Sequence, residues 1–176
     1  QPAELSRLTG WHVVFGAAIP LQGGEYGQAI LSRTALENPQ IHRLPGPGEP
    51  RIALAATTTT GLGTITVVTV HLDFGTAQTA QAEALAKVLE KNSHPVILGG
   101  DFNAAPDSAA MAPFAKAPWT LVPKSPPAAT HPADAPRIEI DHFVLRGVRA
   151  ARPATVLDEP VASDHRPVLV SVTAAR

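Results

Sequence analysis

The chain has 176 residues, a length typical of one domain, and 44% of them are hydrophobic, which is enough for a buried core. Its formal net charge of −1 excludes a strongly basic surface as a global property, while ten Arg among its 14 Lys and Arg residues leave a local basic patch open. It has no cysteine, which excludes disulfides, thiolate catalysis and cysteine-ligated zinc, and its 18 prolines do not suit a helical bundle. No apolar run is long enough for a membrane span, and nothing indicates a compartment.

The first part of the chain is expected to consist mainly of strands. A short helix is predicted to end at Thr9, and a turn-rich loop is expected over residues 45–50. Strands are predicted over residues 11–19, 26–32, 51–60 and 64–72. The last two are rich in Thr, Val and Ile, and the glycines of segment 61–63 between them predict a β-hairpin.

Residues 76–91 form the clearest predicted helix. Apolar side chains recur there at helical spacing and are expected to face the core: Ala82, Leu85, Ala86, Val88 and Leu89. Polar side chains are expected to face away from the core: Gln81, Glu83, Lys87 and Glu90.

The rest of the chain returns to strands and irregular segments. A buried strand is predicted over residues 95–100, a short helix within 106–116, an irregular surface segment over 118–136, and strands over 137–145 and 166–172. A strand-rich chain with one or two helices predicts a single α+β domain over residues 1–176, with two mainly antiparallel sheets.

Four polar clusters lie at the ends of these strands or within them. They are residues 71–73, 99–103, 137–142 and 163–166. A polar group that follows a buried strand lies at the rim of a sheet, where loops build active sites. Carboxylates are ligands for Mg²⁺, and an imidazole oriented by a carboxylate can act as a general base. The clusters therefore predict a metal-assisted hydrolytic site.

Each cluster also has a structural interpretation. His71 alone would more often be a structural hydrogen-bonding group, and Asp101 with Asn103 suits a turn. Asp164 and His165 could cap the entry to a strand. Asp141 fits a structural role less well, because Asp is disfavoured in strands and needs a partner when buried. Four independent clusters together favour function.

Five segments resemble motifs of the endonuclease/exonuclease/phosphatase superfamily, which has the DNase I-like fold. They are Tyr26-Gly-Gln-Ala-Ile-Leu-Ser-Arg33, Val70-His-Leu-Asp73, Gly100-Asp-Phe-Asn103, the segment 130–143, and Ser163-Asp-His-Arg-Pro167. Their order and approximate spacing also agree with the superfamily over essentially the whole chain. Gln28 and His142 depart from the Asn and Tyr common at those places. The resemblance implies a four-layer α/β sandwich with two mainly antiparallel sheets.

The resemblance further implies a phosphoester hydrolase that depends on Mg²⁺ or Mn²⁺. His165 would be the general base or a phosphate contact, oriented by Asp141. Asp101 would position the nucleophilic water or help to bind metal. Asn103 would contact the scissile phosphate, and His71 would contact or protonate a phosphate oxygen.

The metal site is expected to use Asp101 and Asp164. The family pattern also begins with a strand, a helix and a strand that ends in a metal-binding Glu, and the resemblance predicts a truncated chain without that segment. Glu4, Glu25 and Glu37 do not stand in the context of the missing motif. We therefore expect weaker metal binding and an open sheet covered by self-association or by an N-terminal fragment.

The leading interpretation is a divalent-metal phosphoesterase. Its substrate would be a nucleic acid, a phospholipid head group or a small phosphorylated molecule, and the near-neutral charge argues against a nonspecific nuclease. The alternative is a catalytically weak scaffold that associates with itself. A zinc hydrolase using His71, Asp101 and His165 is a third interpretation without supporting motif spacing. Three further histidines are expected to be surface or packing residues: His12, His42 and His94.

Overall fold

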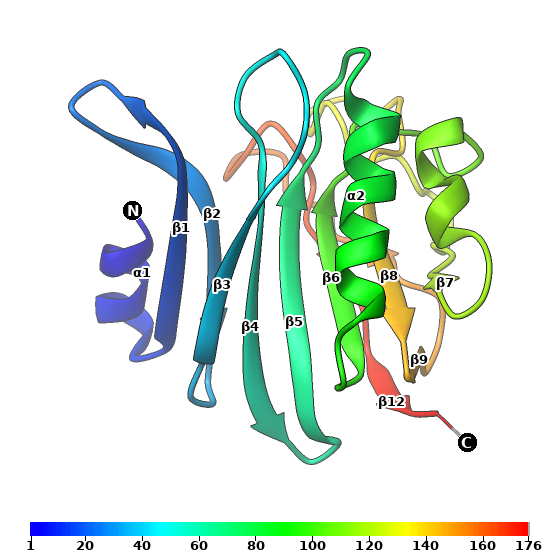
Figure 1. Cartoon of the computed structure of the whole chain (residues 1–176). Coiled ribbons are helices and arrows are strands. Elements are labelled where there is room, and N and C mark those ends of the chain that lie inside the picture. The colour runs from blue at the N-terminus through cyan, green and yellow to red at the C-terminus, as the bar shows by residue number, and fades with distance from the viewer. Residues whose placement is uncertain (176) are drawn as a thin grey trace.

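A six-stranded sheet is the largest element of the computed structural model, which describes residues 1–175 (Figure 1). Its strands run in the order β3 (Glu37–Arg43), β4 (Ile52–Thr60), β5 (Gly63–His71), β6 (Val96–Asp101), β8 (Asp141–Arg146) and β7 (Thr120–Leu121). All neighbouring strands are antiparallel except β5 and β6, which are parallel.

Helix α2 (Gln78–Glu90) makes the crossover between the parallel strands β5 and β6 and covers one face of the sheet (Figure 1). Leu85 and Leu89 of the helix are buried there, as predicted. Two helix predictions are wrong: Val88 is 39% exposed, while Gln81 is 2% exposed. Gln81 is buried because its Oε1 accepts a hydrogen bond from the backbone N–H of Asp73 at 2.8 Å.

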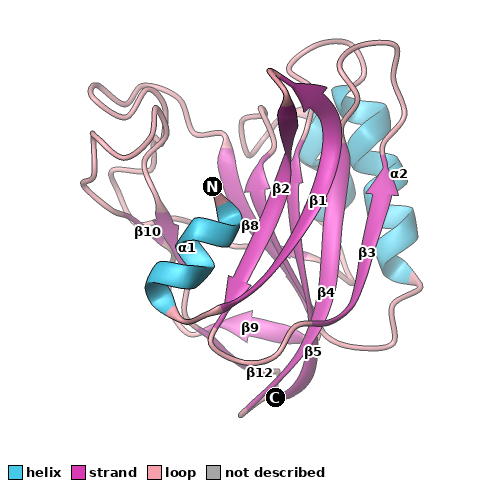
Figure 2. Ribbon diagram, turned by 90° about the vertical axis from the view of Figure 1, so that its left-hand side faces the viewer, coloured by secondary structure: helices cyan, strands magenta, loops and turns pink. Residues whose placement is uncertain are grey.

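The opposite face of the sheet is covered by strand pairs. The pairs are β1 (His12–Leu21) with β2 (Gly24–Ser32), β9 (Val148–Ala150) with β12 (Val172–Ala174), and β10 (Thr155–Val156) with β11 (Val168–Leu169). Ile30 packs on Leu54 beneath the β1–β2 hairpin, whereas Val168 and Val172 pack near Leu145. No backbone ladder joins these pairs to one another within residues 1–175, and Figure 2 shows the β1–β2 hairpin apart from β9, β10 and β12.

Two helices complete the outer layers. Helix α1 (Pro2–Thr9) lies outside the β1–β2 hairpin, on the side of the molecule opposite α2 (Figure 1). A 3₁₀ helix, η1 (Ala109–Phe114), packs beside α2 through Met111 and Phe114. The order of layers is therefore helix, strand pairs, six-stranded sheet and helix. None of the described helices is long and apolar enough to cross a membrane.

Some elements differ from the sequence-based expectation. β3 was not predicted, because Asn38-Pro39 is typical of a turn; in the structure this pair forms an irregularity in an edge strand, where Pro is tolerated. The segment 118–136 is not only a surface segment, because Thr130 is fully buried. The strand expected from residue 137 begins at Asp141, and the last predicted strand is divided into β11 and β12.

Candidate active site

Three neighbouring strands place one polar side chain each in the same row of the sheet. His71 ends β5, Asp101 ends β6 and Asp141 begins β8. In the strand register His71 is opposite Asp101, and Asp101 is opposite Asp141. This row exists because β5 and β6 are parallel, so their carboxyl ends meet, while the antiparallel β8 starts at the same edge.

His165 adds an imidazole to this row from the loop before β11. Its Nδ1 donates a hydrogen bond to Asp141 Oδ2 at 2.9 Å, which leaves the Nε2 lone pair free, 3.9 Å from Asp101 Oδ2. Burial alone would lower the pKa of His165, but the hydrogen bond and charge of Asp141, with the charges of Asp101 and Asp164, raise it above the ordinary value.

His71 has a close contact at each ring nitrogen. The Tyr26 hydroxyl lies 3.0 Å from Nδ1 and donates to it when the ring proton is on Nε2. Nε2 lies 3.3 Å from Asp101 Oδ2, a contact without hydrogen-bond geometry. Burial of the ring and the positive charge of Arg51 lower the pKa of His71, which agrees with the neutral form.

Asp101 combines burial with a neighbouring negative charge. Burial raises the pKa of Asp101, and the charge of Asp141 raises it further. The hydrogen bond from the backbone N–H of Asn103 acts in the opposite direction, but the pKa is raised overall. No Lys or Arg within residues 1–175 forms an ion pair with either carboxylate. Asp101, Asp141 and His165 each offer one ligand atom, and these atoms lie within 4.8 Å of one another. The group suits a divalent cation, because carboxylates are ligands that such cations prefer and no Lys or Arg pairs with these two.

Asn103 braces the loop that follows β6. Its backbone has a φ of 50°, its N–H donates to Asp101 Oδ1 at 2.7 Å, and its Nδ2 donates to the Leu72 carbonyl at 2.9 Å. Nδ2 carries two hydrogens, so one remains for a substrate oxygen.

Asp164 and Asp101, the two predicted metal ligands, belong to different groups. Asp164 is exposed, and its carboxylate lies with the imidazoles of His131 and His165. Asp101 lies with Asp141, and the two groups share His165.

The residues predicted for the site do not include Tyr26, Arg51 or His131. Tyr26 and His131 were noted within motifs, but their contacts with His71 and His165 join residues far apart in the chain. Arg51 is 8% exposed and pairs with Glu49 at 3.1 Å. A buried Arg beside the site carries no local pattern that would identify it.

His142 is buried against Phe102 and also takes part in a hydrogen-bond network. Its Nε2 donates to the Ala104 carbonyl at 2.8 Å, so Nδ1 accepts from Lys124 Nζ at 3.0 Å. Lys124 in turn donates to Glu139 at 2.7 Å. This buried network connects the loop after Asn103 with the strand that carries Asp141.

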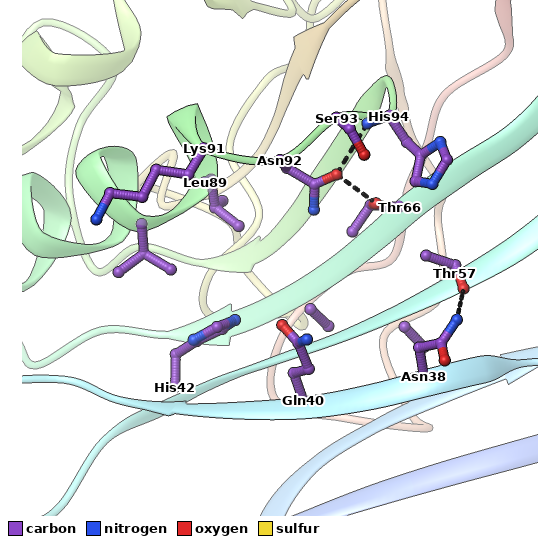
Figure 3. A pocket seen from close by; sticks show the side chains of 13 residues that line it. Asn38, Gln40, His42, Thr57, Thr66, Leu89, Lys91, Asn92, Ser93 and His94 are labelled. Carbon is purple, nitrogen blue, oxygen red and sulfur yellow. Dashed lines mark hydrogen bonds between the residues drawn. The ribbon is translucent and has the colours of Figure 1, made fainter.

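A polar cavity of about 390 Å³ lies away from this row, between β3, β4 and the carboxyl end of α2 (Figure 3). His42 and His94 lie toward opposite ends of it, with Gln40 and Asn92 between them (Figure 3). The two histidines are thus cavity residues as well as surface residues. No Asp or Glu lines this cavity, whereas the cavity of about 320 Å³ beside the row is lined by Asp141 and His165. The carboxylates of Asp101 and Asp141 lie at the row and not at the cavity of about 390 Å³.

A family model described as the endonuclease/exonuclease/phosphatase family matches residues 2–165. The chain belongs to this family. Endonucleases, exonucleases and phosphatases all hydrolyse phosphoesters, so the family of this chain is a class of phosphoesterase-type hydrolases. Among curated protein sequences, none matches it significantly.

Several solved structures share the fold of this chain. A conserved protein of unknown function from Enterococcus faecalis V583 has a TM-score of 0.81 at 21% identity, covering 99% of this chain and 81% of its own. A mannosyl-6-phosphatase from Bacteroides thetaiotaomicron has a TM-score of 0.78 at 20% identity, covering 98% and 80%. Zebrafish TDP2 with a single-strand DNA product has a TM-score of 0.75 at 16% identity, covering 98% and 81%. The predicted DNase I-like fold is confirmed.

Proposed function

We propose that this chain is a divalent-metal-dependent phosphoester hydrolase in which His165 is the general base. The observation that carries the proposal is the pair of His165 and Asp141, placed against Asp101 at the end of the neighbouring strand. A histidine with one nitrogen bonded to a carboxylate and the other free is arranged to take a proton from water.

The carboxylate of Asp141 serves two purposes in this scheme. It fixes the tautomer of His165 by accepting the Nδ1 hydrogen, so the lone pair stays on Nε2. It also stabilises the imidazolium that forms when Nε2 takes the proton of the attacking water. Asp101, 3.9 Å from Nε2, can accept the second hydrogen of that water and orient it.

Asp101, beside Asp141, is the residue that would hold Mg²⁺ or Mn²⁺. When bound, the cation would supply Lewis-acid stabilisation of the charge on the phosphoryl oxygens. The residues fit such a cation because the carboxylates of Asp101 and Asp141 lie close together and no Lys or Arg pairs with them. The contribution expected from Asp164 stays a prediction.

Two further side chains can contact the phosphoryl group. Asn103 has a remaining Nδ2 hydrogen, and neutral His71 would carry a hydrogen on Nε2 when Tyr26 donates to Nδ1. A substrate oxygen that competes for these donors would receive hydrogen bonds without any change in net charge of the site.

The substrate that we propose is a small phosphoester, either a phosphorylated small molecule or a phospholipid head group. The net charge of −1 supports this, because a nuclease that tracks a long nucleic acid uses many cationic contacts with phosphates. The similar structures include a phosphatase of a sugar phosphate and a protein bound to a DNA product, so phosphomonoesters and phosphodiesters both need testing.

The decisive experiment compares the native chain with His165→Ala in the hydrolysis of an aryl phosphodiester and an aryl phosphomonoester, with Mg²⁺ or Mn²⁺. We expect metal-dependent turnover that falls about 10²- to 10⁴-fold in the variant, because the general base is removed. His94→Ala, in the separate cavity, is the matched control and should retain native turnover. Equal turnover in the native chain and His165→Ala would contradict the proposal and favour the scaffold alternative.

A further inference from the structure

A second group of ligand atoms lies on the outer side of His165. His131, Asp164 and His165 each offer one such atom, and the three lie within 4.8 Å of one another. The rings of His131 and His165 have centroids 4.6 Å apart and an interplanar angle of 50°, so they converge rather than stack in parallel. Nδ1 of His131 is shielded from solvent and has no hydrogen-bond partner in the described part of the chain.

Backbone hydrogen bonds hold the segments that carry these side chains together. The N–H of Arg166 donates to the Thr130 carbonyl at 2.7 Å, next to both histidines in the sequence. The N–H of Ala133 donates to the Asp164 carbonyl at 2.7 Å. These two backbone hydrogen bonds join the segment that carries His131 to the segment that carries Asp164 and His165. The backbone positions of the three residues are therefore fixed relative to one another.

The donor set differs in kind from the one beside Asp101. Two imidazoles and one carboxylate form a set typical of zinc and similar transition metals, whereas Mg²⁺ prefers oxygen ligands. The nearby guanidinium of Arg166 does not compete for the group, because it donates to Asp158 at 3.0 Å and to the Ala133 carbonyl at 2.7 Å.

We propose that His131, Asp164 and His165 bind a transition-metal ion of the Zn²⁺ class and that this binding inhibits the hydrolase. Because Nδ1 of His165 is bonded to Asp141, Nε2 is the ring nitrogen left for a cation. The same lone pair is the proposed proton acceptor and cannot serve both purposes. The inhibition rests on the proposed function, while the metal site itself does not.

Zinc binding is tested first, by competition with a chromophoric chelator on the full chain without substrate. We expect His131→Gln and Asp164→Asn each to raise the Kd for Zn²⁺ about tenfold or more, because each removes one ligand. Circular dichroism shows whether each variant is folded. His42→Gln and His94→Gln are the controls, because both histidines lie in the separate cavity, and should leave the Kd unchanged. An unchanged Kd in both site variants, or a loss of binding in a control, would overturn the site.

Inhibition is tested second, as the zinc concentration that halves Mg²⁺-supported turnover, relative to the zinc-free rate of each protein. We expect this concentration to rise in His131→Gln in parallel with its Kd. Zinc that binds to the native chain without slowing it would overturn the inhibitory part of the proposal. If the native chain shows no turnover with Mg²⁺ or Mn²⁺, the proposed function fails, and the binding measurement alone decides the metal site.

Discussion

His165 combines partial burial with three acidic neighbours. Burial acts to lower its pKa, while Asp141, Asp101 and Asp164 raise it, and the net result is a pKa above the ordinary 6.5. A higher pKa makes the free imidazole a stronger base, but it also keeps more of the ring protonated near neutral pH. The proposed base should therefore work best at pH values above its raised pKa.

This balance predicts a defined pH dependence. A general base must be unprotonated, so kcat/KM should fall as pH decreases through the pKa of His165, with a midpoint above 6.5. In Asp141→Asn the negative charge is lost and the acceptor for His165 Nδ1 becomes a neutral amide oxygen, so the midpoint should move to lower pH while the maximal rate also falls. The measurement is kcat/KM against pH for both proteins at saturating Mg²⁺. An identical midpoint in the two profiles would show that the fall of kcat/KM at low pH is not caused by protonation of His165.

The close approach of β5 and β6 brings His71 and Asp101 together. Gly100 has a φ of 152°, and a Cβ built on it would lie 2.0 Å from the Val70 carbonyl oxygen. A side chain there would therefore push β6 away from β5 at the residue next to Asp101. Gly61 lies in the turn between β4 and β5, where a Cβ would meet no atom within 4 Å.

Gly100→Ala is expected to reduce stability and activity together. We expect a loss of roughly 1–3 kcal/mol in the free energy of unfolding, because the backbone conformation and the carbonyl contact both oppose a Cβ. Turnover should fall as well, measured under conditions in which the variant is still folded. Urea denaturation of Gly100→Ala and of Gly61→Ala checks this, and comparable losses in the two variants would contradict the explanation.

The molecule as a whole carries 14 basic and 15 acidic residues, so no large positive field surrounds the site. Under the proposed function, phosphoester recognition would then come from the few groups at the row of β5, β6 and β8. This arrangement suits a substrate with one or two phosphates, which the local groups can contact in full.

A weak salt dependence follows from this charge. Between about 50 and 200 mM salt we expect kcat/KM for a small aryl phosphodiester to change less than about tenfold, whereas 6–10 phosphate contacts would give a change of roughly 10³ to 10⁵. The measurement uses NaCl at fixed Mg²⁺, with a single-stranded oligonucleotide as the second substrate. Turnover of the oligonucleotide with a steep salt dependence would indicate an extended nucleic-acid surface instead.

Local patterns were sufficient to predict the family and most of the strands, and they also indicated the residues that we propose for the site. A buried apolar strand followed at once by polar groups marks the rim of a sheet, and this pattern predicted positions for His71 and Asp101. The structure brings these residues together with Asp141 and His165, which the four clusters indicated but could not pair. Such motifs are local because the backbone direction at the end of a strand depends mainly on neighbouring residues.

Other features depend on contacts between distant parts of the chain. The hydrogen bond from Tyr26 to His71 joins residues 45 positions apart, and the ring contact of His131 with His165 arises from two loops. Gln81 is buried because the backbone of Asp73 meets it, although its position on the helix predicted exposure. Strand order and register decide such contacts, and a local pattern of residues contains no information on which strand lies beside which.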